Sequence, residues 1–465
     1  MTIALAERNL DAIAGLGVPV PRYDRRALSP KILHVGVGGF HRAHMALYTD
    51  EVAAAGGDWG VSGVGLLDAD RQMADALGGQ DLLYTLVERD NDGSSPRVVG
   101  SIVDYAFVAG DEPEFVRRLV DPDVAILSMT ISEGGYSLSG GNPTIETIVS
   151  GLAARLAAGG RPLTILSCDN LPANGAVVRD AIATVAAGRS SELLLYVERS
   201  CTFPTSMVDR ITPQTREEDV RWLRQDIGID DAWPVVCESF RQWVIEDDFA
   251  AGRPAWESAG ALFTDRVHDW ELYKLRLLNA SHSCMAYLAA LAGVEFVDEA
   301  MGIPPIRLYL ERFLSTEAIP TLSEIPGHPA REYAETVFRR LENKNVRDQI
   351  ARLCIDGASK FPSFLIPTIE TQIERGGPVE CGALALAGWA RYLATVPAAK
   401  RAPDAHGDEA TAAAADGPEA FLQLEMVFTT PLRESERFRD AFVAASRELA
   451  ERGPLAAMGA LTPVA

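Results

Sequence analysis

The feature that most restricts the fold of this 465-residue chain is the segment KILHVGVGGFHRAH, which begins at Lys31. An apolar run ends in three closely spaced glycines, and a helical pattern over residues 45–55 follows. A strand, a glycine turn and a helix in this order open a nucleotide-binding sheet, because glycines let backbone N–H groups approach a pyrophosphate. His41 occupies the third glycine position of the usual GxGxxG pattern. The sequence therefore predicts a cofactor turn formed by Gly36, Gly38, Gly39 and Phe40.

Further strands and helices alternate along the first half of the chain. Helical patterns over residues 113–119 and 144–158 separate some of the apolar runs. Strands interleaved with helices indicate an α/β fold with a mostly parallel, doubly wound sheet. The predicted strands lie within WGVSGVGLLDAD, RVVGSIVDYAFV, VAILSMTI and LTILSCDN.

The sequence pattern changes near Trp270. From there, ELYKLRLLNASHSCMAYLAALAG has apolar residues at helical spacing, and later segments continue in the same way. We expect a nucleotide-binding domain over residues 1–269 and a mainly α-helical domain over residues 270–465. The tract over residues 399–418 is rich in Ala, Asp, Gly and Pro without periodicity, which predicts an exposed loop.

Polar residues follow two of the predicted strands. Asp68 and Asp70 come after the second strand, where a carboxylate can bind an adenosine ribose and repel a 2′-phosphate. This position favours NAD over NADP, with Asp70 preferred, although a solvated turn explains two such aspartates almost as well. Thr130 and Glu133, in SMTISEGGY, follow a later strand at the edge where such folds bind ligands. Glu133 is equally compatible with an exposed turn.

The segment ELYKLRLLNASHS carries the clearest chemical signal. Lys274, Asn279 and His282 have a K-x4-N-x2-H spacing, which on an α-helix keeps the three side chains within about 140° of one another. Apolar neighbours indicate that this helix is buried. The alternative is an amphipathic helix with an exposed lysine, a capping asparagine and a buried histidine.

Oxidation of an alcohol needs a base for the hydroxyl proton and donors for the oxygen. Lys274 can be that base only if its ordinary pKa of about 10.4 is lowered by desolvation and nearby positive charge. Glu271, one turn earlier, opposes this if it is ionised and close, so we expect it to exchange protons with solvent or to lie outside the pocket. Asn170, at the end of a predicted strand, is expected to supply a second amide donor beside Asn279. Asn174 is expected to shape the following turn.

Composition excludes several classes of protein. A hydrophobic fraction of 47% is sufficient for a large core, and a net charge of −22 disfavours nucleic acid and anionic membranes as partners. Neither a membrane span nor a signal peptide is apparent, so a cytoplasmic location is expected. The six cysteines lie far apart and are expected to be reduced and buried.

Three alternative functions are open to the same residues. His41 and His44 have a spacing compatible with zinc, but no third ligand is evident, so no metal site is predicted. A short-chain dehydrogenase would need a YxxxK motif, which is absent around Lys274. A protein that binds NAD without turnover would not need Lys274, Asn279 and Asn170 together.

With these residues in place, the chain resembles the polyol-specific long-chain dehydrogenase family, most closely its mannitol 2-dehydrogenase branch. The resemblance implies a Rossmann-type domain followed by a helical domain, with NAD as cofactor, a polyol or ketose as substrate and the active site between the domains. It covers nearly the whole chain through seven ordered segments: GVGGFHRAH, TISEGGY, SCDNLPANG, FPTSMVDRITP, FRQWVIEDDF, KLRLLNASHS and DGASKFPSFLIPTI.

The same resemblance assigns roles to individual residues. Lys274 matches the general base, while Asn170 and Asn279 match the two amides that stabilise the oxyanion. Glu271 matches a position linked to proton exchange with solvent. The resemblance implies substrate binding by His282, Asp209, Arg352 and Lys360.

The expected reaction is NAD-dependent oxidation of a mannitol-like polyol to a ketose, and the reverse reduction. Arabinitol, sorbitol and altritol differ from mannitol only in length or configuration. Uronate reductases of the same family are the nearest different chemistry, because Arg352 or Lys360 could bind a substrate carboxylate. The sequence makes no prediction of oligomeric state.

Overall fold

The computed structural model describes residues 2–461, except for the side chain of Glu133. The chain divides into two compact units, Met1–His268 and Asp269–Ala465. The boundary expected from the sequence, between residues 269 and 270, lies one residue further along the chain. Each unit is described separately below.

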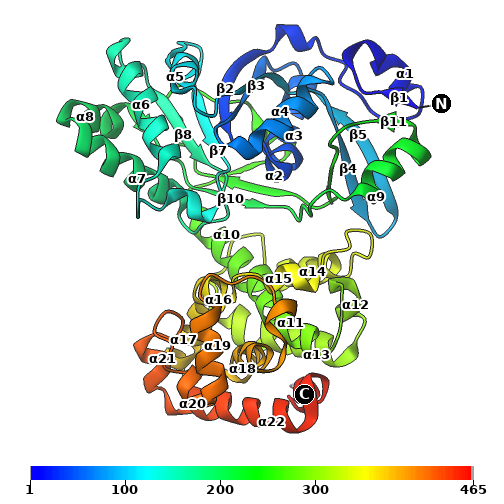
Figure 1. Cartoon of the computed structure of the whole chain (residues 1–465), viewed down its shortest axis with the longest axis vertical. Helices are drawn as coiled ribbons and strands as arrows, with labels where there is room; N and C mark the ends of the chain where they lie inside the picture. The colour runs from blue at the N-terminus through cyan, green and yellow to red at the C-terminus, as the bar shows by residue number, and fades with distance from the viewer. Residues whose placement is uncertain (1, 462–465) are drawn as a thin grey trace. The chain divides into compact units, whose positions relative to one another are not determined.

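The main sheet of the first unit is parallel throughout and has six strands in the order β6-β3-β2-β7-β8-β9. β2 comes first in the chain, and the sheet extends from it on one side through β3 and β6 and on the other side through β7, β8 and β9. This is the doubly wound order of a dinucleotide-binding fold. The expected α/β class is therefore confirmed (Figure 1). The strands are β2 (Ser29–Val35), β3 (Trp59–Gly65), β6 (Ile102–Phe107), β7 (Ile126–Met129), β8 (Leu163–Ser167) and β9 (Cys201–Thr202).

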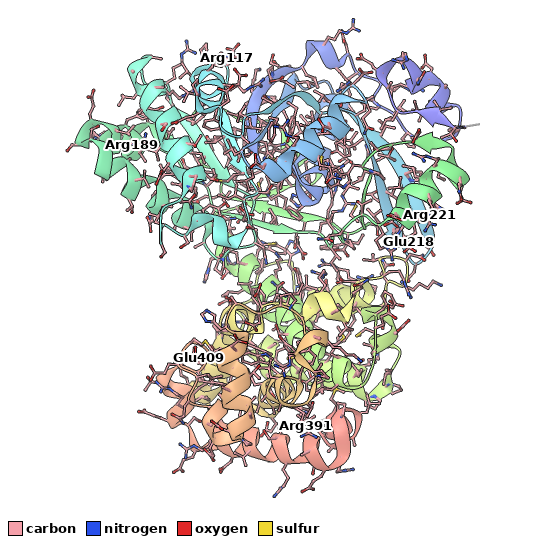
Figure 2. All side chains as sticks on the ribbon, in the orientation of Figure 1. Arg117, Arg189, Glu218, Arg221, Arg391 and Glu409 are labelled. Carbon is pink, nitrogen blue, oxygen red and sulfur yellow. The ribbon has the colours of Figure 1, made fainter. Side chains whose placement is uncertain are left out.

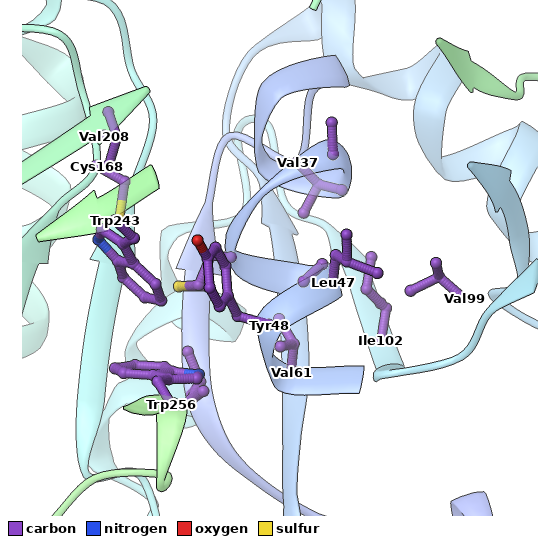
Figure 3. Packing of buried hydrophobic residues seen from close by; sticks show 14 of the residues in the cluster. Val37, Leu47, Tyr48, Val61, Val99, Ile102, Cys168, Val208, Trp243 and Trp256 are labelled. Carbon is purple, nitrogen blue, oxygen red and sulfur yellow. The ribbon is translucent and has the colours of Figure 1, made fainter. Parts of the chain in front are cut away.

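Both faces of this sheet are buried, because alternate side chains of a strand point to opposite faces. In β2, Ile32 belongs to one apolar cluster, whereas Leu33 and Val35 belong to the other. Figure 3 shows the first cluster, in which Tyr48 lies beside Trp243 at a ring-centroid distance of 5.3 Å. The same cluster includes Ile32 and Val61, through which the helices that follow the glycine turn pack against β2 and β3.

The helices of this unit cover the two faces. The first face carries α2 (Gly39–Ala43), α3 (Met45–Ala54) and, further along the chain, α4 (Arg71–Gly78). The other carries α5 (Glu112–Val120), α6 (Pro143–Ala157), α7 (Asn174–Arg189) and α8 (Ser191–Ser200) (Figure 1). Side-chain caps fix several helix starts: the Asn142 Oδ1 atom accepts the backbone N–H of Ile145 at 3.0 Å, with Pro143 in the first turn.

One predicted strand divides between two sheets. The run RVVGSIVDYAFV supplies both the end of β5 (Gly93–Val99) and the whole of β6. β5 pairs antiparallel with β4 (Tyr84–Asp90), which pairs with β12 (Val235–Glu238) in a separate three-stranded sheet. Two smaller sheets complete the unit; they contain β10 (Ser206–Asp209), β13 (Gln242–Ile245) and β14 (Leu262–Phe263), and β1 (Ile3–Ala4) with β11 (Ile229–Asp230). Two short helices lie close to these strands in the sequence: α1 (Leu10–Ala14) follows β1, and α9 (Glu217–Trp222) precedes β11.

The second unit is helical, as the sequence predicts. Its central helix α18 (Glu380–Thr395) is apolar on most sides and packs against α11 (Ala280–Leu291) and α22 (Glu436–Ala460). The intervening chain forms α12 (Val297–Met301), α13 (Pro304–Arg312), α14 (Ala330–Leu341), α15 (Ile350–Leu353), α16 (Gly357–Phe364) and α17 (Ile366–Arg375), and α20 (Pro418–Phe421) and α21 (Thr430–Glu434) precede α22.

The prediction of an exposed loop over residues 399–418 is wrong in its central part. Residues Gly407–Asp416 form helix α19, which packs against α18 and buries Ala410 completely. Alanine has the highest helix propensity, and an alanine stripe needs no large side chain to pack closely on a neighbour. The tract therefore lacks a strong apolar period while still forming a helix.

Surface and core differ as expected for a globular chain. The labelled side chains of Arg117, Arg189, Arg221 and Glu409 in Figure 2 are all exposed. All six cysteines are buried and unpaired, which confirms that prediction. Within residues 2–461, no helix is both long and apolar enough to cross a bilayer.

Candidate functional site

The glycine turn after β2 has one position that only glycine can occupy. Gly36 has φ +87°, and a Cβ atom there would lie 2.2 Å from the carbonyl oxygen of Thr130. The Thr130 hydroxyl donates a 2.6 Å hydrogen bond to the Gly36 carbonyl, and His34 Nε2 lies 3.2 Å from that hydroxyl. Thr130, predicted as a cofactor contact, is thus placed at the turn and fixes its shape.

Gly38 and Gly39 are different, because the packing of the chain does not require them to be glycine. A Cβ atom at Gly38 would come no closer than 3.9 Å to the nearest protein atom, and one at Gly39 no closer than 3.8 Å. Neither residue has a left-handed backbone. Two adjacent glycines at a strand-to-helix turn have no side chains to keep a ligand away from the backbone N–H groups. This arrangement suits the pyrophosphate of a dinucleotide. Phe40 follows them, partly buried, with its ring stacked on His44.

Asp68 and Asp70 lie in the turn after β3, next to β2 in the sheet. Asp68 is exposed, whereas Asp70 is half-buried and accepts the backbone N–H of Leu67 at 2.9 Å. Asp70 also packs so closely on the end of β3 that a Cβ atom at Gly65 would lie 2.6 Å from its Cβ. Asp70 therefore has a fixed position, and both carboxylates lie at the carboxyl edge of the sheet, as predicted.

The loops after β7 and β8 are joined by Asp169, a residue to which the sequence analysis gave no role. Its carboxylate accepts hydrogen bonds from the backbone N–H groups of Ile131 at 2.9 Å and Ser132 at 3.0 Å, and from the Tyr136 hydroxyl at 2.6 Å. The Glu133 side chain lies outside the described residues, so its predicted cofactor contact is not described. Asp169 fixes the loop that carries Glu133 against the end of β8.

Asn170 follows Asp169 directly and is partly buried. The next turn is held by Asn174, whose side-chain amide donates to the carbonyls of Ser167 at 3.1 Å and Ser206 at 2.8 Å and whose oxygen accepts the Ser206 N–H. Asn174 is fully buried and so joins β8 to β10, a larger role than the local turn expected from the sequence. The backbone that carries Asn170 is thereby fixed on both sides.

Asp209, the last residue of β10, is 3% exposed and pairs with Gln242 of β13. The next residue, Arg210, is buried and donates to the carbonyls of Ala43 at 2.6 Å and Glu238 at 3.0 Å, and it forms an ion pair with Glu88. Arg210 thus ties the strand that carries Asp209 to the helix that follows the glycine turn.

In the second unit, Lys274–Asn279 form a π-helical turn between α10 (Val267–Tyr273) and α11. The backbone N–H of Ala280 donates to the carbonyl of Leu275, five residues earlier. The uniform α-helix assumed in the sequence analysis is therefore wrong here. A widened turn brings residues five apart closer to one face than an α-helix does, so it favours the alignment of Lys274 with Asn279. Single π-turns inside α-helices frequently mark functional sites.

Lys274 and Glu271 are buried. Lys274 is 8% exposed and is flanked by the buried side chains of Leu275, Leu277 and Leu278. Glu271, three residues earlier, is 5% exposed. Burial as such disfavours the charged form of an amine.

His282, one turn after Asn279, remains uncharged. Burial lowers the pKa of His282 to about 4, so the imidazole is neutral at pH 7. Its Nε2 atom is buried and has no hydrogen-bond partner within the described part of the chain. A neutral imidazole with one uncommitted nitrogen can exchange a hydrogen bond with a hydroxyl group.

Arg352 and Lys360, both predicted to bind substrate, lie on α15 and α16, which pack against α11. Arg352 forms an ion pair with Asp348 through two hydrogen bonds of 2.6 and 2.5 Å. Lys360 Nζ donates to the carbonyls of Arg352 at 3.4 Å and Leu353 at 3.3 Å. Asp348 was not identified from the sequence, since an acid four residues before an arginine is common on helices.

The two histidines considered for zinc are core residues. His41 is 1% exposed and stacks on His34 at a ring-centroid distance of 3.5 Å, and His44 Nε2 lies 3.0 Å from the Gln242 carbonyl. Burial lowers the pKa of both imidazoles well below the ordinary range. Over residues 2–461, no cluster of three or more potential metal ligands is found.

The predicted residues therefore form two groups, one in each unit. In the first unit, the turns after β2, β3, β7 and β8 lie at the same edge because these four strands are parallel neighbours. Asp209 also belongs to the first unit, at the end of β10. In the second unit, α10, the π-turn, α11, α15 and α16 carry the remaining predicted residues.

Comparison with known proteins identifies both parts of the chain. Residues 30–258 match the mannitol dehydrogenase Rossmann domain, and residues 266–450 match the mannitol dehydrogenase C-terminal domain. A mannitol 2-dehydrogenase of Phaeosphaeria nodorum is 39% identical over 94% of this chain and 82% of its own length. A mannitol 2-dehydrogenase of Aspergillus terreus is 38% identical over 98% of both chains.

Solved structures agree with these matches. Pseudomonas fluorescens mannitol 2-dehydrogenase, in a ternary complex with NAD and D-mannitol, has a TM-score of 0.90 and 38% identity over 99% of both chains. A D-sorbitol dehydrogenase in substrate-free form has a TM-score of 0.88 and 34% identity over 98% of this chain and 100% of its own. The resemblance noted from the sequence is confirmed. The chain belongs to the mannitol dehydrogenase family.

Proposed function

We propose that this protein is an NAD-dependent polyol dehydrogenase that oxidises a secondary alcohol of a mannitol-like substrate to a ketose and catalyses the reverse reduction. The observation that carries the proposal is the buried π-turn, which presents Lys274 and Asn279 on a helix whose next turn bears the neutral His282. Alcohol oxidation needs a base for the hydroxyl proton and donors for the oxygen, and a neutral imidazole can hydrogen-bond a further hydroxyl.

The cofactor assignment is supported by the bare turn at Gly38 and Gly39 and by the P. fluorescens relative, which was solved with NAD. The pyrophosphate would be held by this turn, and the adenosine ribose by Asp68 or Asp70. A carboxylate at this position repels a 2′-phosphate, so NAD is preferred to NADP. When bound, the nicotinamide supplies the hydride acceptor.

Lys274 would act as the base that accepts the hydroxyl proton of the substrate. Burial disfavours the charged ammonium, and in its neutral form the amine would accept the proton of the substrate hydroxyl. Glu271, which is also buried, would pass that proton on toward solvent. Asn170 and Asn279 would donate their amide N–H groups to the same oxygen and stabilise its negative charge as the carbonyl forms.

Substrate hydroxyls away from the reacting carbon would be held by His282, Asp209, Arg352 and Lys360. The carboxylate of Asp209 is an acceptor only, and a polyol offers it several O–H donors. This donor and acceptor set suits an uncharged, hydroxylated chain.

The test is a substrate panel followed by NADH absorbance. Mannitol, sorbitol, arabinitol and altritol are offered with NAD and, in parallel, with NADP; fructose and fructuronate are offered with NADH. We expect turnover of mannitol and fructose with NAD(H) and much weaker turnover with NADP. Binding of NAD without turnover of any substrate would instead identify a non-catalytic NAD-binding protein.

A further inference from the structure

Asp348 occupies one of the two hydrogen-bonding edges of the Arg352 guanidinium. Its Nε atom donates to Asp348 Oδ1 at 2.6 Å, and one terminal nitrogen donates to Oδ2 at 2.5 Å. This two-bond geometry is the one through which arginine recognises a carboxylate of any origin. A carboxylate of the protein therefore already occupies the Nε/Nη2 edge and leaves the Nη1/Nη2 edge for a ligand.

The fold holds this ion pair in place. The Asp348 carbonyl accepts the backbone N–H of Val297 at 2.9 Å, and Ile350 donates to the Glu295 carbonyl at 3.0 Å. The Asp348 side chain is 6% exposed, whereas that of Arg352 is 48% exposed. Burial alone would raise the pKa of the Asp348 carboxyl, but the hydrogen bonds from Arg352 lower it below its ordinary value. Asp348 is consequently a fixed negative charge at neutral pH.

The pair belongs to the same cluster as the predicted substrate residues. Lys360 Nζ donates to the backbone carbonyl of Arg352 itself, and α11, which carries His282, packs on α15 and α16. The charges of Asp348 and Arg352 have opposite effects on the pKa of His282 and partly offset each other there. With Asp348 present, Arg352 adds little net positive charge to this cluster.

We propose that Asp348 determines substrate specificity: by occupying one edge of Arg352 and offsetting its positive charge, it disfavours hexuronates and favours uncharged polyols and ketoses. This inference rests on the proposed function. A uronate on the remaining edge would place its carboxylate next to that of Asp348 on the same guanidinium, which is unfavourable. A polyol hydroxyl needs only the remaining N–H donors of the guanidinium.

The experiment compares reduction of D-fructose and D-fructuronate by NADH in the wild type and in Asp348→Asn. The asparagine keeps the size of the side chain but removes the competing charge. We expect the wild type to prefer fructose, and Asp348→Asn to raise the fructuronate-to-fructose ratio of kcat/KM at least tenfold, mainly through a lower KM for fructuronate. The double variant Asp348→Asn/Arg352→Gln should lose this gain, because the cation that binds the uronate is gone.

Glu448→Gln is the matched control, since it removes the acid of an i,i+4 ion pair with Arg452 on α22. The fructuronate-to-fructose ratio of kcat/KM in this variant should equal that of the wild type. If folded Asp348→Asn has the same fructuronate-to-fructose ratio of kcat/KM as the wild type, the inference is overturned. An equal increase of this ratio in the double variant would overturn it too. Neither result would affect the proposed function. If Asp348→Asn does not fold, Asp348→Ser is measured in its place. A wild type that prefers fructuronate would overturn the inference without any variant, and a wild type that reduces neither would overturn the proposed function.

Discussion

The Tyr136 hydroxyl donates a 2.6 Å hydrogen bond to the Asp169 carboxylate, and both side chains are buried. Burial, together with the charge of Asp169, raises the pKa of Tyr136 well above its ordinary value, so this hydroxyl remains a donor at any physiological pH. The contact joins the loop after β7 to the end of β8, where Asn170 begins the next turn. The position of a proposed oxyanion donor therefore depends on its neighbour in the sequence.

Asp169→Asn should lower kcat for mannitol oxidation by roughly tenfold to hundredfold, because a displacement of about 1 Å in a catalytic group has this effect. The new amide group would face the N–H of Ile131 or Ser132 in place of an acceptor, at a cost of about 1–3 kcal/mol in the free energy of unfolding. Steady-state kinetics and thermal unfolding measure the two effects. Asp180→Asn, on the exposed surface of α7 beside Arg179, is the control and should change neither. Full activity in Asp169→Asn would contradict the positioning role.

The glycine turn allows fold and cofactor binding to be tested separately. Gly36→Ala should destabilise the protein by about 2–6 kcal/mol, the sum of roughly 1–3 kcal/mol for backbone strain and roughly 1–3 kcal/mol for overpacking against Thr130. Gly39→Ala meets only ordinary contacts, so it should leave the melting temperature nearly unchanged. It should instead raise the KM for NAD at least tenfold, because its methyl group would occupy the place of the pyrophosphate. A normal KM for NAD in Gly39→Ala would argue against the proposed cofactor turn.

The elements that could be predicted from sequence are those whose signal is local. The apolar run before Gly36 and the runs that became β3, β7 and β8 mark buried parallel strands, and the K-x4-N-x2-H spacing marks a buried helix. Features set by distant partners could not be predicted. The strand β5 separates from β6 only because β4 and β12 provide another sheet, and α19 forms because α18 offers it an apolar surface.

The same distinction applies to the candidate site. Strand ends and motif spacing point to candidates such as Asn170 and Lys274, whereas Asp209 was predicted only through the family resemblance. Asp169 and Asn174 act through hydrogen bonds to groups more than 30 residues away, so no periodicity reveals them. Asp348 lies four residues before Arg352, a spacing too common to mark a site. The π-turn is likewise invisible to a pattern that assumes a constant number of residues per turn.

Because Glu317 is buried, we expect the free energy of unfolding to depend on pH for a reason unrelated to catalysis. It is 1% exposed, accepts the backbone N–H groups of Cys381 and Gly382, and burial raises its pKa to about 7. Because the folded pKa lies above the ordinary value of 4.5, its contribution to stability is complete below about pH 4.5 and is lost as pH rises to about 7.

Glu317→Gln cannot titrate, so the free energy of unfolding of the wild type relative to this variant should fall between about pH 4.5 and pH 7, by on the order of 3 kcal/mol at most. Urea unfolding of both proteins across this range measures the difference. Glu374→Gln, on the exposed side of α17, serves as control and should show no such trend. A difference that is constant with pH would show that Glu317 ionises in the folded state as easily as in the unfolded one.

The most direct test of the account is the activity of Lys274→Ala with mannitol and NAD, measured beside Lys400→Ala, which removes an exposed lysine. We predict that Lys274→Ala binds NADH normally, loses at least a thousandfold in kcat and is partly restored by added primary amines, whereas Lys400→Ala is unchanged. A Lys274→Ala protein that keeps kcat within tenfold of the wild type would contradict the assignment of Lys274 as the base.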